Sequence, residues 1–89
     1  MLSIFRASSF KVDFKKLNND DKEKLKHILI ILVNNGSLEE RHKNHPPIGN
    51  YNGCLECHIK PDLLLIYKID MALNELQLIR VGSHSQLFK

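Results

Sequence analysis

The spacing of apolar residues predicts two helices in the first third of the chain. Phe10, Phe14 and Leu17 recur at helical intervals and would line one face of a short first helix. Ser8 and Ser9 precede this face, and both are residue types that cap a helix start. We therefore expect the first helix to begin at one of these serines.

A longer second helix is predicted after the polar residues 18–20. Asp20 and Glu23 form a capping-box-like entry, and residues 34–36, with the sequence Asn-Asn-Gly, end the helix. The apolar face of this helix consists of Leu25, Ile28, Leu29, Leu32 and Val33.

Beyond Gly36 the pattern becomes polar and then extended. Residues 37–50 predict a loop, with one helical turn near residues 38–41. Residues 63–66 are apolar on both faces, which is typical of a central strand. The predicted strands are 51–59, 63–70 and 75–81, with an additional edge strand at 2–5.

The resulting order, β-α-α-β-β-β, predicts the α+β class. We expect a small antiparallel sheet with the two N-terminal helices packed on one of its faces. At 89 residues the chain is too short to divide its core, so residues 1–89 are expected to form one domain.

The charge of the chain favours a polyanionic partner. Thirteen Lys and Arg residues against ten Asp and Glu residues give a formal net charge of +3 and a pI near 9.0. The first third is rich in lysine: Lys11, Lys15, Lys16, Lys22, Lys24 and Lys26.

The sequence predicts a cytoplasmic location, because it contains neither a signal peptide nor a membrane-length apolar run. In that compartment the two cysteines, Cys54 and Cys57, are expected to be free thiols.

Five polar residues, each beside a predicted strand or turn, form a candidate active site. His45, His58, Asp62, Arg80 and His84 supply the groups needed to cleave a phosphodiester by acid and base chemistry without a metal. RNA is a suitable substrate because its own 2′-hydroxyl attacks the phosphorus once a base removes the proton. Strand alternation places Glu56 on the same face as His58, so we expect the site on the open face of the sheet.

A competing pattern is C-x-x-C-H at residues 54–58, which matches covalent attachment of c-type haem. A zinc site built from Cys54, Cys57 and His58 with His45 or His42 is a second alternative. Both are disfavoured because Cys54 and Cys57 would point to opposite faces of a strand. Cys57 as a small buried core residue is the simpler interpretation.

Each polar residue also has an interpretation without function. His27 and His42 are assigned to this class, and the lysine-rich helices are by default solvated faces. Taken alone, Arg80 is better explained by an ion pair to a buried acid such as Glu56 than by a functional role. Pro61-Asp62 is explained equally well by a hairpin turn.

Four stretches of the second half, residues 45–47, 56–62, 63–69 and 80–88, resemble the YafQ-type ribonuclease toxins of the RelE superfamily. The resemblance implies a ribosome-dependent, metal-independent endoribonuclease that cuts mRNA, with no cofactor and no metal site. The implied catalytic residues are His45, His58, Asp62 and His84, and the implied substrate-binding residues are Arg80, Phe88 and Lys60.

The resemblance also implies individual roles. Asp62 or His58 would be the general base, His84 the general acid, and His45 a positioning or charge-stabilising partner. Phe88 would stack on a base or close the site. The chain departs from the family at Leu63, where some relatives carry tryptophan, and at Leu55, where arginine is common, and both changes would weaken RNA contact.

The partners implied by the resemblance are mRNA, the ribosome and a cognate antitoxin, with operator DNA bound only through the antitoxin complex. An alternative from a different class is a non-catalytic module that binds nucleic acid or a protein partner on the same fold. Substitution of His84 separates the two, because only an enzyme would lose cleavage while it keeps binding.

Overall fold

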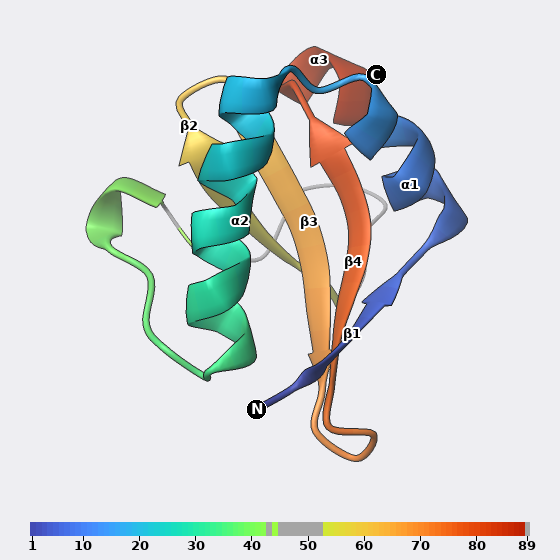
Figure 1. Cartoon of the computed structure of the whole chain (residues 1–89), viewed down its shortest axis with the longest axis vertical. Helices are drawn as coiled ribbons and strands as arrows, with labels where there is room; N and C mark the ends of the chain where they lie inside the picture. The colour runs from blue at the N-terminus through green and yellow to red at the C-terminus, as the bar shows by residue number, and fades with distance from the viewer. Residues whose placement is uncertain (43, 45–52, 89) are drawn as a thin grey trace.

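The computed structural model describes residues 1–42, 44 and 53–88. Its strands form one sheet in the order β1-β4-β3-β2, with α2 crossing one face (Figure 1). The predicted α+β class and element order are confirmed. In chain order the elements are β1 (Ser3–Arg6), α1 (Ser8–Lys15), α2 (Asn19–Val33), the 3-10 turn η1 (Glu40–His42), β2 (Leu55–Lys60), β3 (Leu63–Asp70), β4 (Glu75–Gly82) and α3 (His84–Leu87).

The sheet is mixed. β2, β3 and β4 pair antiparallel as predicted, whereas β1 pairs parallel with β4, in the register Ser3 opposite Glu75 to Arg6 opposite Leu78. A parallel pair needs a long crossover, and here α1, α2, β2 and β3 all lie between the two strands in sequence. The sequence pattern of a four-residue edge strand does not distinguish parallel from antiparallel pairing.

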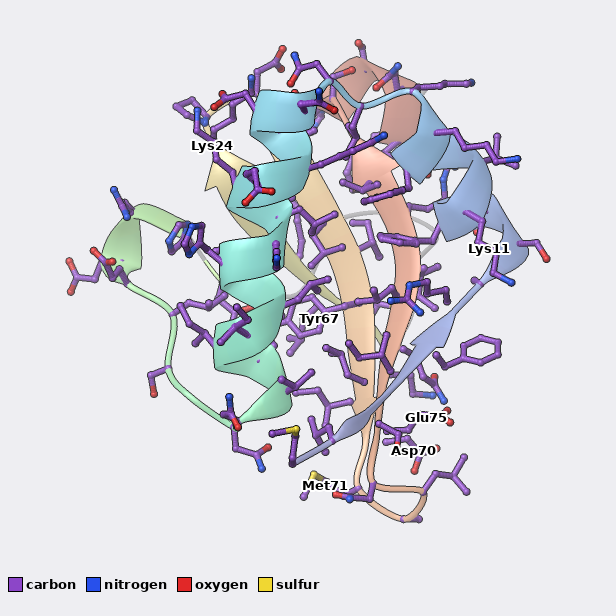
Figure 2. The ribbon with its side chains drawn as sticks, viewed as in Figure 1. Lys11, Lys24, Tyr67, Asp70, Met71 and Glu75 are labelled. Atoms are coloured by element: carbon purple, nitrogen blue, oxygen red, sulfur yellow. The ribbon has the colours of Figure 1, made fainter. Side chains whose placement is uncertain are left out.

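The main core lies between α2 and the sheet. Leu25, Ile28 and Leu32 of α2 pack with alternate residues of β3, and Leu65 and Tyr67 are fully buried there. Figure 2 shows Tyr67 behind α2. The Tyr67 hydroxyl donates a 2.7 Å hydrogen bond to Asn44, and burial raises its pKa to about 12. Thus β3 is the doubly covered strand that its apolar pattern predicted.

Both predicted helix caps were wrong. The N-cap of α1 is Ala7, because its N–H still donates to Leu78 of β4 (2.9 Å) and the helix begins only at the next residue. The N-cap of α2 is Asn18, whose side chain accepts the N–H of Asp21 at 2.8 Å. Asp20 therefore lies inside the first turn of α2.

The second face of the sheet is partly covered by α3, an element that the sequence pattern did not predict. Leu87 packs on Leu64 and Ile66 of β3, and Phe88 and Ile79 join this smaller cluster. In the described part of the chain, no helix covers the rest of this face, on the side of β2.

The strand limits agree with the prediction at β3 and differ elsewhere by a few residues. β2 begins at Leu55, because Gly53 has a positive φ of 78° and turns the chain just before it. Residues 51 and 52, which were predicted as part of this strand, lie outside the described residues. Within the described ranges, no helix is long and apolar enough to cross a membrane.

Candidate active site

β2 places Glu56 and His58 on the face opposite the helices. Between them Cys57 points into the main core, so strand alternation turns its two neighbours outward. The His58 Nε2 lies 3.7 Å from the Glu56 Oε1, and their side chains are 19% and 7% exposed. The His58 Nδ1 lies 3.4 Å from the Pro61 carbonyl oxygen, at the limit of a hydrogen bond. A nearly buried carboxylate thus faces a partly exposed imidazole.

α3 brings a second histidine to this face. His58 pairs with Leu64, and Leu64 pairs with Gly82, so two strand spacings, about 10 Å, separate His58 from the end of β4. His84 follows two residues later as the first residue of α3, whose Leu87 packs on Leu64. The sheet register therefore places His58 beside Leu64, and the helix that carries His84 packs on the same leucine.

The orientation of His84 is set by the short helix that it begins. Ser83 is the N-cap, and it forms a reciprocal capping box with Gln86. The His84 ring lies against the ring of Phe88, one turn later, with centroids 4.9 Å apart. His84 is exposed and Phe88 is half-buried, so this aromatic pair presents one edge to solvent.

A β-bulge moves Lys60 away from His58. The register shifts between His58 and Lys60, and Lys60 pairs with Leu63, a residue of the main core. The Lys60 Nζ lies 2.7 Å from Asp21 of α2, a hydrogen bond that raises the Lys60 pKa. Lys60 therefore lies on the helix side of the sheet.

Asp62 lies in the two-residue turn between β2 and β3. Its side chain is exposed, and the next residue, Leu63, is buried in the main core. The leucine that replaces the aromatic residue of some relatives is thus a core residue here.

Arg80 is held by Asp13 of α1. The Arg80 Nε donates to Asp13 Oδ2 at 2.6 Å and its Nη2 donates to Oδ1 at 3.1 Å, while the Val81 N–H also donates to Oδ2 at 3.1 Å. β1 pairs with β4 only as far as Leu78, so side chains of α1 satisfy the following stretch of the β4 edge. Ser9 Oγ donates to the Ile79 carbonyl oxygen (2.7 Å) in the same way.

The cysteines lie on opposite sides of the sheet, as strand geometry predicted. Cys57 is fully buried in the main core, and Cys54 packs on the smaller cluster beneath α3. Burial, and then the charge of Glu56, raises the Cys57 pKa to about 12, and burial also raises that of Cys54. Among the described residues no three His, Cys, Asp or Glu side chains are grouped so that they would hold a metal ion. This arrangement does not fit the haem or zinc alternatives.

The remaining histidines differ in their surroundings. His45 lies outside the described residues, and His27 is exposed on α2. His42 is only 7% exposed, and its Nδ1 donates to the His58 carbonyl oxygen at 2.8 Å. Local spacing does not predict this contact, because His42 and His58 are sixteen residues apart.

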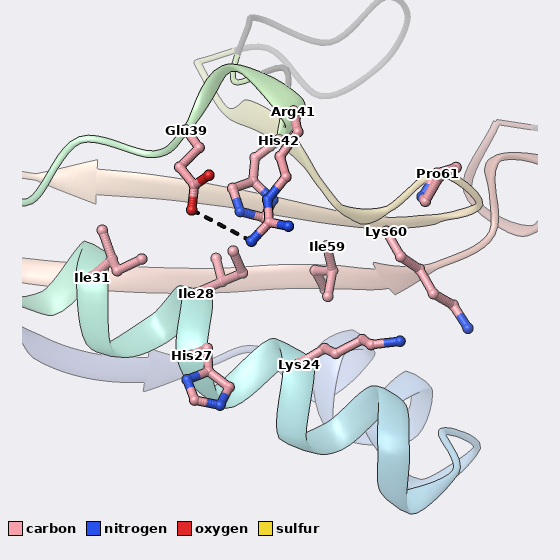
Figure 3. A pocket seen from close by; sticks show the side chains of 10 residues that line it. All are labelled: Lys24, His27, Ile28, Ile31, Glu39, Arg41, His42, Ile59, Lys60 and Pro61. Atoms are coloured by element: carbon pink, nitrogen blue, oxygen red, sulfur yellow. Dashed lines mark hydrogen bonds and ion pairs between the residues drawn. The ribbon is translucent and has the colours of Figure 1, made fainter.

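A cleft of about 680 Å³ lies between α2 and the η1–β2 edge. Figure 3 shows Lys24 and His27 on α2, and Arg41 and His42 on η1, around this cleft. Its cations are paired: Lys24 with Asp20 at 3.0 Å, Arg41 with Glu39 at 3.4 Å, and Lys60 with Asp21. The cleft lies on the helix side, whereas His58 and Glu56 face away from it.

Comparison with known proteins gives a consistent result. The family model described as bacterial toxin of type II toxin-antitoxin system, YafQ, matches residues 2–89. The mRNA interferase toxin YafQ of Escherichia coli (strain K12) is 36% identical over 78 residues, which cover 86% of this chain and 83% of that protein.

Solved structures agree over the whole length of the chain. A metal-bound toxin from Helicobacter pylori is 41% identical with a TM-score of 0.90, covering 99% of this chain and 100% of its own. The toxin chain in the E. coli DinJ-YafQ toxin-antitoxin complex is 32% identical with a TM-score of 0.85, covering 99% and 98%.

The fold, the histidine-bearing sheet face and these matches define a toxin of a type II toxin-antitoxin system. Within this class the chain belongs to the YafQ family, which confirms the resemblance found in the sequence.

Proposed function

We propose that this protein is an endoribonuclease that cleaves mRNA on the ribosome, without a metal, by acid and base catalysis. The observation that carries the proposal is the placement of the His58–Glu56 pair and the His84–Phe88 pair on one sheet face around Leu64. The E. coli relative is named an mRNA interferase, and this chain matches it over most of both lengths.

The proposed reaction uses the 2′-hydroxyl of the RNA as the nucleophile. A base removes its proton, the 2′-oxygen forms a bond to the adjacent phosphorus, and the bond from phosphorus to the 5′-oxygen breaks. An acid gives a proton to that 5′-oxygen, which leaves a 2′,3′-cyclic phosphate and a 5′-hydroxyl end. Positioned proton transfer of this kind contributes about 10²–10⁴-fold to the rate.

His58, Asp62 and His84 are the proposed proton-transfer groups, with His45 as a charge-stabilising partner. Glu56 joins this set as the group that orients the His58 imidazole, because it is the carboxylate beside the His58 Nε2. We assign the acid and the base to this set of groups rather than to one residue.

Substrate contacts are proposed for Phe88, which would stack on a base, and for Arg80, whose charge would stabilise the phosphate. Asp13 holds the Arg80 guanidinium in one orientation. Lys60 is left out of the proposed site, because its ammonium group pairs with Asp21 on the helix side of the sheet.

The proposed biological setting is a cytoplasmic toxin neutralised by a cognate antitoxin, which binds operator DNA with the toxin as a complex. The support is family membership and the structure of the related E. coli toxin with DinJ.

The test is cleavage of a reporter mRNA, with the ends mapped, by wild type, His84→Ala and the control His27→Ala. The protein is stripped with chelator, its metal content is verified, and it is then added to programmed ribosomes in Mg²⁺ buffer, since ribosomes need this ion. A parallel reaction contains free RNA and EDTA.

We expect the stripped wild type and His27→Ala to cut on the ribosome, with 5′-hydroxyl ends, and His84→Ala to bind without cutting. Cleavage that requires added transition metal would contradict the metal-free mechanism, and equal cutting of free RNA would contradict ribosome dependence. Binding without cleavage by wild type would identify a non-catalytic module instead.

A further inference from the structure

We propose that His42 is a positioning residue for His58, an inference that rests on the catalytic role proposed for His58. His42 belongs to η1, and its ring is almost completely buried. Its Nδ1 lies 2.8 Å from the His58 carbonyl oxygen. A carbonyl oxygen only accepts, so the His42 Nδ1 carries the proton and donates it.

The site of this hydrogen bond is the outer edge of the sheet. β2 is a terminal strand, and its other edge is already paired with β3. A carbonyl group that points away from the sheet has no neighbouring strand to satisfy it. η1 supplies the missing donor through the His42 side chain.

The contact coincides with the β-bulge that follows His58. The register is regular from Leu55 to His58 and shifts before Lys60. Bulges interrupt a ladder and change the direction of nearby side chains, so the backbone orientation at such a point needs an additional constraint. The His42 hydrogen bond fixes the His58 peptide at this irregular position.

The constraint acts on catalysis through geometry. The His58 ring reaches Glu56 on one side and the Pro61 carbonyl on the other, at 3.7 and 3.4 Å, and neither contact is short. Because the imidazole is attached to this backbone, rotation of the His58 peptide would move the ring along the sheet face. A displacement of about 1 Å at a reacting group costs about 10²-fold in rate.

The burial of His42 limits what else it does. Figure 3 shows its side chain directed from η1 toward the cleft beside α2. This cleft lies on the helix side of the sheet, whereas Glu56 lies on the opposite face. His42 therefore acts through the His58 backbone and not by contact with RNA at the active face.

The experiment compares His42→Leu, which removes the donor, with His42→Asn, whose side-chain N–H occupies nearly the same place as Nδ1–H. His27→Leu is the matched control, because His27 is an exposed histidine on α2 that lines the same cleft. For each protein, kcat and KM on programmed ribosomes are measured separately, together with thermal unfolding.

We expect His42→Leu to lower kcat by about tenfold to a hundredfold with KM unchanged. His42→Asn should restore kcat to within about threefold of wild type, since it replaces the hydrogen bond. If His42 had only a structural role, both variants would have a lower melting temperature, and kcat would not fall selectively in His42→Leu. Wild-type kcat in a folded His42→Leu protein would overturn the inference.

Nitrogen-15 and proton NMR of the imidazole rings provides a readout that does not depend on cleavage. Wild type should show a slowly exchanging Nδ1–H for His42, and the His58 ring signals should shift in His42→Leu but not in His27→Leu. Absence of the protected His42 proton in wild type overturns the inference even if His42→Leu does not fold. Failure of wild type to cleave RNA, with these signals present, contradicts the proposed function and leaves the His42 contact established.

Discussion

Glu56 is the residue whose surroundings differ most from those of an ordinary strand carboxylate. Its side chain is only 7% exposed, and it lies beside His58 on the proposed catalytic face. A carboxylate in this position stabilises the positive charge that develops on the ring when the ring accepts a proton during the reaction. Glu56 therefore contributes to the proposed catalysis through its charge.

Glu56→Gln keeps the shape of this side chain and removes the charge. We expect kcat to fall by about 10²-fold with little change in KM, because the charge matters most when His58 is protonated. The measurement is single-turnover cleavage on programmed ribosomes, with the exposed Glu23→Gln as control. A kcat equal to that of wild type would show that Glu56 is only a structural acid.

Cys57 predicts how stability changes at alkaline pH. Its pKa rises from 9.0 to about 12 in the folded protein, because burial and the Glu56 charge disfavour the thiolate. Above pH 9 the unfolded chain loses this proton while the folded chain keeps it. Folding stability is therefore complete below pH 9 and decreases between pH 9 and 12.

The expected decrease for this one proton is about 1.4 kcal/mol per pH unit. Urea unfolding of wild type and Cys57→Ala at pH 8, 9, 10 and 10.5 measures it, and the variant should show the smaller slope. Tyr67, with a pKa of about 12, adds a similar decrease above pH 10 in both proteins. Equal slopes in the two proteins would contradict the burial of a protonated thiol.

At the scale of elements, α1 is joined to the sheet through polar contacts of its Asp13 and Ser9 with β4. Asp13 accepts from both the Arg80 guanidinium and the Val81 N–H, and it is 10% exposed. Removing the carboxylate charge leaves a partly buried cation and a backbone donor poorly satisfied.

Asp13→Asn should lower the free energy of unfolding by about 1–3 kcal/mol. Urea denaturation detects this loss, and the exposed Glu23→Gln serves again as control. If the variant is as stable as wild type, Asp13 is not the group that holds α1 on β4.

The elements predicted well from the sequence are those whose residues are similarly buried along the whole element. β3 agrees with its predicted limits because it is apolar on both faces and buried along most of its length. α3 was missed because four residues are too few to establish a helical period. Its capping box, Ser83 with Gln86, was the signal that would have revealed it.

The candidate site was less predictable because it depends on irregular pairing. The bulge after His58 turns Lys60 toward α2. The alternation of polar and apolar residues in β2 does not predict this bulge. Arg80 was recognised as a residue that pairs with an acid, and the structure pairs it with Asp13 of the first helix, which the sequence analysis did not suggest. Long-range partners of this kind are fixed by packing and not by local spacing.

For the whole molecule, the asymmetry of charge suggests how partners bind. Lys11, Lys15 and Lys16 are exposed on or beside α1, and Figure 2 shows Lys11 at the outer surface of this helix. Both proposed partners, ribosomal RNA and an acidic antitoxin segment, would be attracted to such a surface.

Charge reversal of all three lysines to glutamate should weaken binding to ribosomes and to the antitoxin, and should reduce the salt dependence of both. Equilibrium binding at several salt concentrations measures this effect, and unchanged affinity for both partners contradicts the proposal. Because these lysine side chains are exposed, the variant should retain the core contacts of α1.

The pairing of β1 with β4 also has a consequence for synthesis of the chain. Among the described residues β1 pairs with β4, the last strand of the sheet to be synthesised, and α1 is held by the same strand. A nascent chain therefore keeps its N-terminal strand and first helix without their sheet partner until β4 has been synthesised and has left the ribosomal exit tunnel.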